Sequence, residues 1–139
     1  MTATREELLS LIGRLEEATE EQVRDQEWLK ETRATIADAF FDRAKPDAFS
    51  EPRWWFSGWF GWETLEDGPN WLFSIDAAIP GESIRKVERR RFDNGTVYWV
   101  AVQDADGDGC GFEGHGATEA LARRIACLKA RAKLMESTP

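Results

Sequence analysis

Residues 84–103 read IRKVERRRFDNGTVYWVAVQ, and this stretch decides the fold. Two strand-like runs flank Asn94-Gly95, and an Asn-Gly pair in this position is the strongest short-range signal for a β-hairpin, because both turn residues adopt positive φ. A third run follows the glycine-rich segment Asp106-Gly107-Asp108-Gly109. The sequence therefore predicts three antiparallel strands in a meander, over residues 84–92, 96–103 and 110–113.

The middle strand of this meander is apolar on both faces. Val97, Trp99 and Ala101 alternate with Tyr98, Val100 and Val102. Because successive side chains of a strand point to opposite faces, we expect both faces of the sheet to be covered. A helix is predicted after Thr118, which can cap it, and this helix would cover one face. Its apolar stripe consists of Leu121, Ile125, Leu128 and Ala132.

Two further helices are predicted in the N-terminal part of the chain. Thr4-Arg5-Glu6-Glu7 has the capping-box pattern that begins a helix. Thr19-Glu20-Glu21-Gln22 repeats this pattern, so a second helix is expected to run from there to about Phe41. The apolar stripe of the first helix consists of Leu8, Leu11, Ile12 and Leu15.

A length of 139 residues suits a single domain, residues 1–139. Within it we distinguish a helical N-terminal part (1–42), a tryptophan-rich segment (53–80) and a strand-strand-strand-helix unit (83–135). The elements predict an α+β protein. We expect an α-β-α layered sandwich, with N-terminal helices, an antiparallel meander of three to four strands and a C-terminal helix.

The chain is acidic, with a net charge of −8 at pH 7 and a pI near 4.8. Negative charge repels phosphate backbones at long range, which argues against non-specific binding to nucleic acid or to anionic membranes. A protein partner is therefore favoured, with nucleic acid as the alternative. No apolar run reaches the roughly 20 residues that a membrane span needs, and the first residues lack an apolar signal-peptide core. These features predict a cytoplasmic protein.

No recognisable catalytic motif is present. The sequence lacks Gly-x-Ser-x-Gly, a phosphate-binding loop and His-Glu-x-x-His. Cys110 and Cys127 do not form a Cys-x-x-Cys pair, and the single histidine, His115, cannot build a multi-histidine metal centre. We therefore expect two free thiols, no enzyme activity and no cofactor.

Residues 104–109 match the beginning of a calcium-binding loop. Asp104, Asp106 and Asp108 lie two residues apart, so that alternate carboxylates can converge on one cation, and glycine occupies the sixth position. The twelfth position, where such loops carry glutamate, is His115, and the flanking runs are strand-like. A calcium site and a solvated hairpin turn are both compatible with this pattern, and the turn is the favoured interpretation.

The tryptophan-rich segment offers a candidate partner-binding surface. Its tryptophans are Trp54, Trp55, Trp59, Trp62 and Trp71. Tryptophan buries a large area, so these rings are expected to build much of the core. Five neighbouring rings exceed what one small core face hides, so part of the cluster is expected to stay exposed and available to a partner.

A basic island lies within the first strand of the meander. It consists of Arg85, Lys86, Arg89, Arg90 and Arg91. Arginine binds phosphates and carboxylates through two parallel hydrogen bonds. A solvated strand that pairs with the protein's own carboxylates or protects a sheet edge explains the same residues.

Three segments resemble the phage ABA sandwich domain, a family of small phage and prophage proteins. They are LIGRLEEAT (11–19), WLFSIDAAIP (71–80) and GHGATEALARRIACLKARA (114–132). The resemblance implies a helix-sheet-helix layered fold and a phage origin. It does not extend to residues 20–52, and it assigns no functional residue.

Charge, size and this resemblance together favour a non-enzymatic phage or prophage accessory protein that binds a macromolecular partner. Such a protein would act as a host-takeover or anti-defence factor, with its negative surface mimicking or blocking nucleic acid. The alternative is a nucleic-acid-binding module that uses the basic strand and exposed tryptophans.

Overall fold

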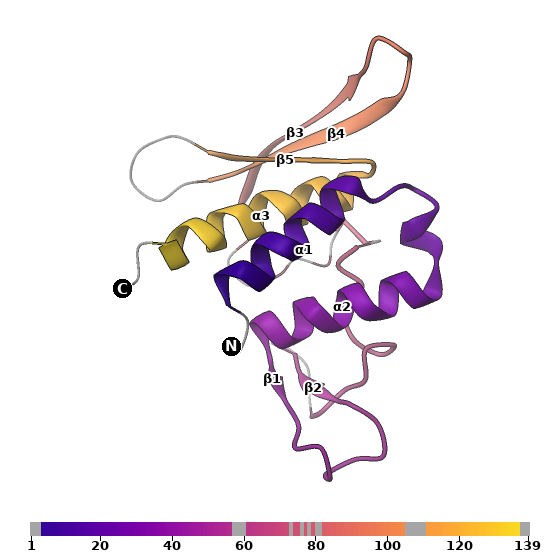
Figure 1. Ribbon diagram of the computed structural model, residues 1–139, viewed down its shortest axis with the longest axis vertical. Coiled ribbons are helices and arrows are strands. Elements are labelled where there is room, and N and C mark those ends of the chain that lie inside the picture. Colours follow the sequence, from indigo (N-terminus) through magenta and orange to yellow (C-terminus); the bar gives the residue numbers. More distant parts are fainter. Residues whose placement is uncertain are drawn as a thin grey trace.

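The computed structural model describes residues 4–56, 61–72, 74, 75, 77, 79, 82–104 and 111–136. Two antiparallel sheets and three α-helices make up this part of the chain (Figure 1). The elements are α1 (Arg5–Glu17), the 3₁₀ turn η1 (Gln22–Arg24), α2 (Gln26–Phe40), β1 (Asp42–Arg43), β2 (Trp54–Trp55), β3 (Ile84–Arg91), β4 (Val97–Gln103), β5 (Phe112–Gly116) and α3 (Glu119–Glu136). The predicted α+β class, the antiparallel meander and the C-terminal helix are confirmed.

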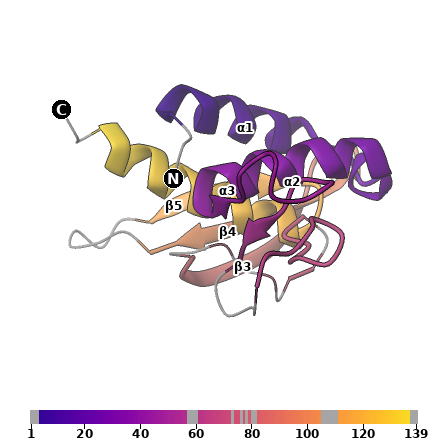
Figure 2. The ribbon, with the colours of Figure 1, turned by 90° about the horizontal axis from the view of Figure 1, so that it is seen from below.

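The larger sheet has the order β3-β4-β5, and the helices stack on one side of it (Figure 2). α3 packs on the sheet, and α1 packs on α3. This order differs from the expected α-β-α sandwich, in which helices cover both faces. On the other face, Val100 lies in register between Glu88 and His115 and is nevertheless buried. Among the described residues, the strand neighbours of Val100 on this face are Glu88 and His115, and no described helix packs there.

Small residues bring α3 close to the sheet. Ala101 of β4 packs against Ala122 and Ala126 of α3. A Cβ atom on Gly114 would lie 2.2 Å from the carbonyl oxygen of Ala122, so only glycine fits there. This explains why β5 runs to Gly116, beyond the predicted end at Glu113: the glycines that weaken a strand in isolation are required for the contact with the helix.

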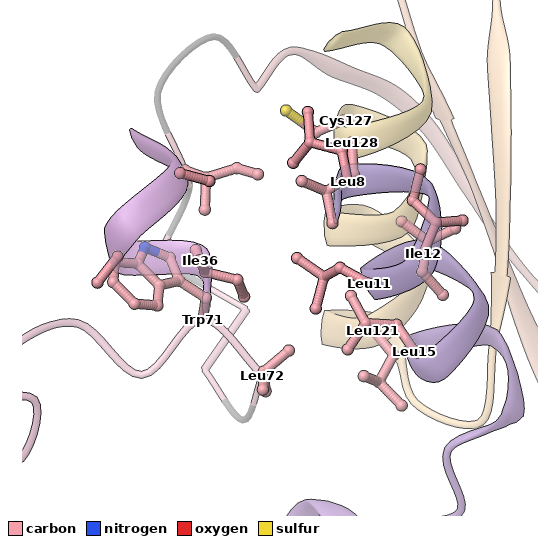
Figure 3. Packing of buried hydrophobic residues seen from close by; sticks show 14 of the residues in the cluster. Leu8, Leu11, Ile12, Leu15, Ile36, Trp71, Leu72, Leu121, Cys127 and Leu128 are labelled. Carbon is pink, nitrogen blue, oxygen red and sulfur yellow. The ribbon is translucent and has the colours of Figure 1, made fainter. Parts of the chain in front are cut away.

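The main core lies between the three helices and the segment after β2. Figure 3 shows the leucines of α1 facing Leu121 and Leu128 of α3, with Ile36 of α2 and the ring of Trp71 closing the cluster. The predicted apolar stripes of α1 and α3 are buried as expected.

Capping side chains set the helix starts. The Thr4 hydroxyl accepts a hydrogen bond from the Glu7 amide, as predicted. The second helix begins later than predicted, because the Asp25 carboxylate accepts from the Trp28 amide and caps α2. The predicted capping pair is present, but it lies at the start of η1: Thr19 and Gln22 exchange hydrogen bonds between backbone amides and side chains.

The β3–β4 turn is wider than a two-residue Asn-Gly turn. The Gly95 amide donates to the Phe92 carbonyl, and the Phe92 amide donates to the Thr96 carbonyl. Gly95 has φ of 91°, and Asn94 does not adopt positive φ. The prediction of a hairpin was right, whereas the prediction that both turn residues adopt positive φ was wrong, because a three-residue loop needs only the glycine in the left-handed region.

Candidate macromolecule-binding surfaces

The outer half of the β3–β4 hairpin extends beyond the helices (Figure 1). The hairpin residues that pack near α3 include Ile84, Val87, Trp99 and Ala101. Residues 89–96 are all exposed. We call residues 89–98 the hairpin arm. Its position leaves both faces of the two strands accessible to a partner.

Cations lie on both faces of the hairpin arm. In the register of the sheet, Arg89 lies opposite Trp99 and shares the helix side of the sheet with it. Arg90 lies opposite Tyr98 on the open side. Among the residues that the structure describes, Arg89 and Arg91 form no ion pair with a carboxylate. These two guanidinium groups are therefore available to an anionic partner.

The other cations of the island share two carboxylates. Lys86 and Arg90 both pair with Glu88 at 2.7 Å, and their hydrogen bonds hold the pKa of Glu88 below its ordinary value. Arg85 lies 3.6 Å from Asp104. Two cations against one carboxylate leave β3 with excess positive charge even where its residues are paired.

Three rings stack in a row on the open face of the sheet, which we call the ring row. The ring centroids of Phe92 and Tyr98 are 4.3 Å apart, with the planes inclined by 23°. Tyr98 stacks on His115 at 5.9 Å and 13°. Phe92 is 54% exposed, so one face of its ring contacts Tyr98 while much of the rest meets solvent. These residues come from three segments that only the strand register brings together.

The tryptophan cluster divides between core and surface. Trp54 and Trp71 are buried, and the indole of Trp54 donates to Asp38 Oδ1 at 2.8 Å. Trp55 is 46% exposed and meets Trp62 edge to face at 5.5 Å. Trp59 lies outside the described residues. The expectation of a partly exposed cluster holds for the Trp55–Trp62 pair.

This tryptophan pair and the basic strand lie apart. β2, which carries Trp55, is at the end of the molecule opposite the hairpin arm (Figure 1). Trp55 and Trp62 therefore do not share a surface with the basic strand. The rings near its arginines are those of the ring row on the open face and the half-buried Trp99, opposite Arg89, on the other. Nothing in the local sequence signals this row, because it depends on the pairing of β3, β4 and β5.

The predicted calcium ligands are only partly described. Asp106 and Asp108 lie outside the described residues, as does Cys110. Asp104 accepts from the Ser83 hydroxyl and pairs with Arg85. Within the described ranges, no group of three or more metal-ligating side chains forms.

Cys127 is a buried residue of the core. Burial raises the pKa of the Cys127 thiol to about 12, which suppresses its nucleophilic thiolate form. A pocket of about 190 Å³ at the start of α3 is smaller than typical ligand sites, and we assign no ligand to it. None of the described helices is long and apolar enough to cross a membrane.

Comparisons with protein-family models, curated proteins and solved structures found no match. The resemblance to the phage ABA sandwich domain therefore stays a prediction. Assignment of a function rests on the surface geometry of the chain itself.

Proposed function

We propose that this protein is a binding protein whose hairpin arm contacts an anionic macromolecular partner. The single observation that supports this most is the projection of Arg89 and Arg91, without carboxylate partners in the described chain, on an arm exposed on both faces. Arginine is among the residues that contribute most to binding at interfaces. The arm is also largely free of core packing, so its side chains can change partners without cost to the fold.

The distribution of charge supports the same surface. Exposed carboxylates are numerous on α1, on α2 and in the segment that joins these two helices. These are Glu6, Glu7, Glu16, Glu17, Glu20, Glu21, Asp25, Glu27 and Glu31. A negative helical side and a positive arm would orient the molecule, so that the arm meets an anionic partner first.

The test is recovery of the partner from cells that naturally encode the protein, after crosslinking and with protein and nucleic acid both quantified. The double variant Arg89→Glu/Arg91→Glu should lose the partner that the wild type retains. Arg24→Glu, a charge reversal at an exposed residue of η1, should retain it. If the double variant retains the same partner as the wild type, the arm is not the contact surface. A parallel Trp55→Ala variant reports whether the tryptophan pair binds instead.

A second candidate function uses the acidic helices. Carboxylates outnumber the exposed cations Arg14, Arg24 and Lys30 on α1, on α2 and between these helices, which favours a phage or prophage factor that occupies the basic surface of a host protein. Reversal of Glu20 and Glu21 to lysine would then abolish retention of a basic protein and leave the arm's partner bound. Retention of the same proteins by this variant and the wild type would exclude this second candidate.

A further inference from the structure

We infer that the partner of the hairpin arm is a single-stranded nucleic acid, whose bases continue the ring row and whose phosphates meet the arginines of β3. This inference rests on the proposed function of the arm and names the class of partner. It follows from three features of the arm that coincide: the stacking geometry of the rings, the open face on which they lie and the exposed arginines of the same strand. Arg90 lies on this open face, whereas Arg89 and Arg91, which form no ion pair among the described residues, lie on the other face.

The ring row has an accessible end at Phe92. One face of this ring contacts Tyr98, and the residue is more than half exposed on a part of the hairpin that makes no core contact. A nucleobase is a planar ring that stacks on aromatic side chains whatever its sequence. In a duplex both faces of every base are already stacked, so a free aromatic face suits an unpaired strand better.

The cations lie where the backbone of such a strand would run. Arg91 directly precedes Phe92 in the chain, and Arg90 lies opposite Tyr98 across the hairpin. β3 is an edge strand, and its exposed arginines alternate between the helix side, Arg89 and Arg91, and the open side, Arg90. Phosphates can therefore contact Arg89 and Arg91 from the edge while the bases lie over the open face.

The net charge of −8 is compatible with this partner, because many of the exposed carboxylates lie on α1, on α2 and between them, whereas Asp93 and Glu113, which contacts His115 at 3.3 Å, lie beside the ring row. Repulsion from the helical side weakens non-specific association and restricts contact to the arm. We therefore expect a modest affinity for single strands that depends both on the aromatic rings and on the arginines of the arm. A protein that is basic over its whole surface would bind nucleic acid more tightly and with less dependence on any one residue.

Fluorescence anisotropy with labelled oligouridine and oligoadenosine strands of about 12 nucleotides tests this inference on the full chain. The wild type should bind at low salt, and Phe92→Ala should weaken binding about tenfold, within the range for loss of one stacking ring. Phe49→Ala, which removes an exposed phenylalanine from the connection between β1 and β2, should have no effect. Phe92→Trp should restore binding, since it keeps an aromatic face.

The salt dependence of the affinity tests the phosphate contacts separately. Arg91→Ala should reduce the slope of log affinity against log salt concentration by about 0.7, the value for loss of one contact to a single strand. Arg24→Ala, on the acidic side of the molecule, should leave the slope unchanged. Circular dichroism of each variant confirms that the comparison is between folded proteins.

Four results would overturn the inference, and the last would overturn the proposed function as well. If a labelled duplex binds more tightly than the single strands, the arm binds in a groove of double-stranded nucleic acid. Equal effects of Phe92→Ala and Phe49→Ala would remove the ring row from the interface. If no strand binds while the cellular partner still depends on Arg89 and Arg91, the partner is an acidic protein and the proposed function stands. If the cellular partner is also independent of these arginines, both proposals fail.

Discussion

Arg124 of α3 and Glu82, which precedes β3, form a buried ion pair in which Nη1 lies 2.5 Å from Oε1. The arginine has no solvent exposure, and it also donates hydrogen bonds to the carbonyl oxygens of Trp71, Ser74 and Ile75. Burial lowers the pKa of Arg124 and raises that of Glu82, while each charge opposes the shift in the other. This single side chain thus ties the irregular segment before the sheet to the helix that packs on it.

Arg124→Met should lower the free energy of unfolding by about 3–5 kcal/mol, the usual cost of leaving one partner of a buried ion pair uncompensated. Three carbonyl oxygens would lose their donor as well, which adds to the cost. Urea denaturation followed by circular dichroism measures the change.

Arg123→Met is the matched control. Arg123 pairs with Glu119 one turn away on the partly exposed side of the same helix, at 2.8 Å. Loss of such a pair costs well under 1 kcal/mol. Similar losses in the two variants would show that Arg124 contributes no more than a surface pair.

Much of the fold could be predicted because the decisive signals are local. These signals are the alternation of apolar residues in the middle strand, the Asn94-Gly95 pair and the apolar stripe after Thr118. Each of them is formed by residues that are close together in the sequence. Arg124 could not be predicted as buried, because an arginine among other cations on a helix is typical of a solvated face. Its burial depends on carbonyl oxygens about 50 residues away, in a segment that shows no periodicity.

The candidate site was predicted only in part, for the same reason. The basic island is contiguous in sequence, so its arginines were identified directly. The ring row required the register in which Tyr98 faces Arg90 and Val100 faces His115. A register is a property of three strands together, and no single run of the sequence specifies which of its rings will stack.

Gly114→Ala should destabilise the protein by more than 2 kcal/mol, in the range of overpacked sites. The new methyl group would lie 2.4 Å from the Ala126 backbone nitrogen as well as against the Ala122 carbonyl, and helix backbone cannot yield as a flexible side chain does. Thermal denaturation measures the loss.

Gly13→Ala serves as the comparison for that substitution. Gly13 lies inside α1 with open space around its Cα, so a methyl group meets nothing within 4 Å. Alanine should stabilise the helix there by about 0.5–1 kcal/mol. If both glycine substitutions change stability in the same direction, close helix-sheet packing at Gly114 is not the cause.

The thiol of Cys127 should resist alkylation in the folded protein. With its pKa at about 12, the thiolate fraction near pH 8 falls about a thousandfold below that of a free cysteine, whose pKa is about 8.5 to 9. Labelling by iodoacetamide in a Cys110→Ser background, read by mass spectrometry, should be negligible until urea unfolds the chain. Rapid labelling without urea would show that the α3 core opens readily.

Trp54 and Trp55 are adjacent in sequence and should differ sharply in their contribution to stability. Trp54→Ala removes a fully packed ring and the indole donor to Asp38, so a loss of about 3–5 kcal/mol is expected. Trp55→Ala removes a half-exposed ring whose main described contact is the edge-to-face pair with Trp62, so about 1 kcal/mol is expected. Urea denaturation of both variants gives the comparison. Equal losses would place Trp55 in the core as well, and would leave the surface of β2 without an aromatic residue free to bind a partner.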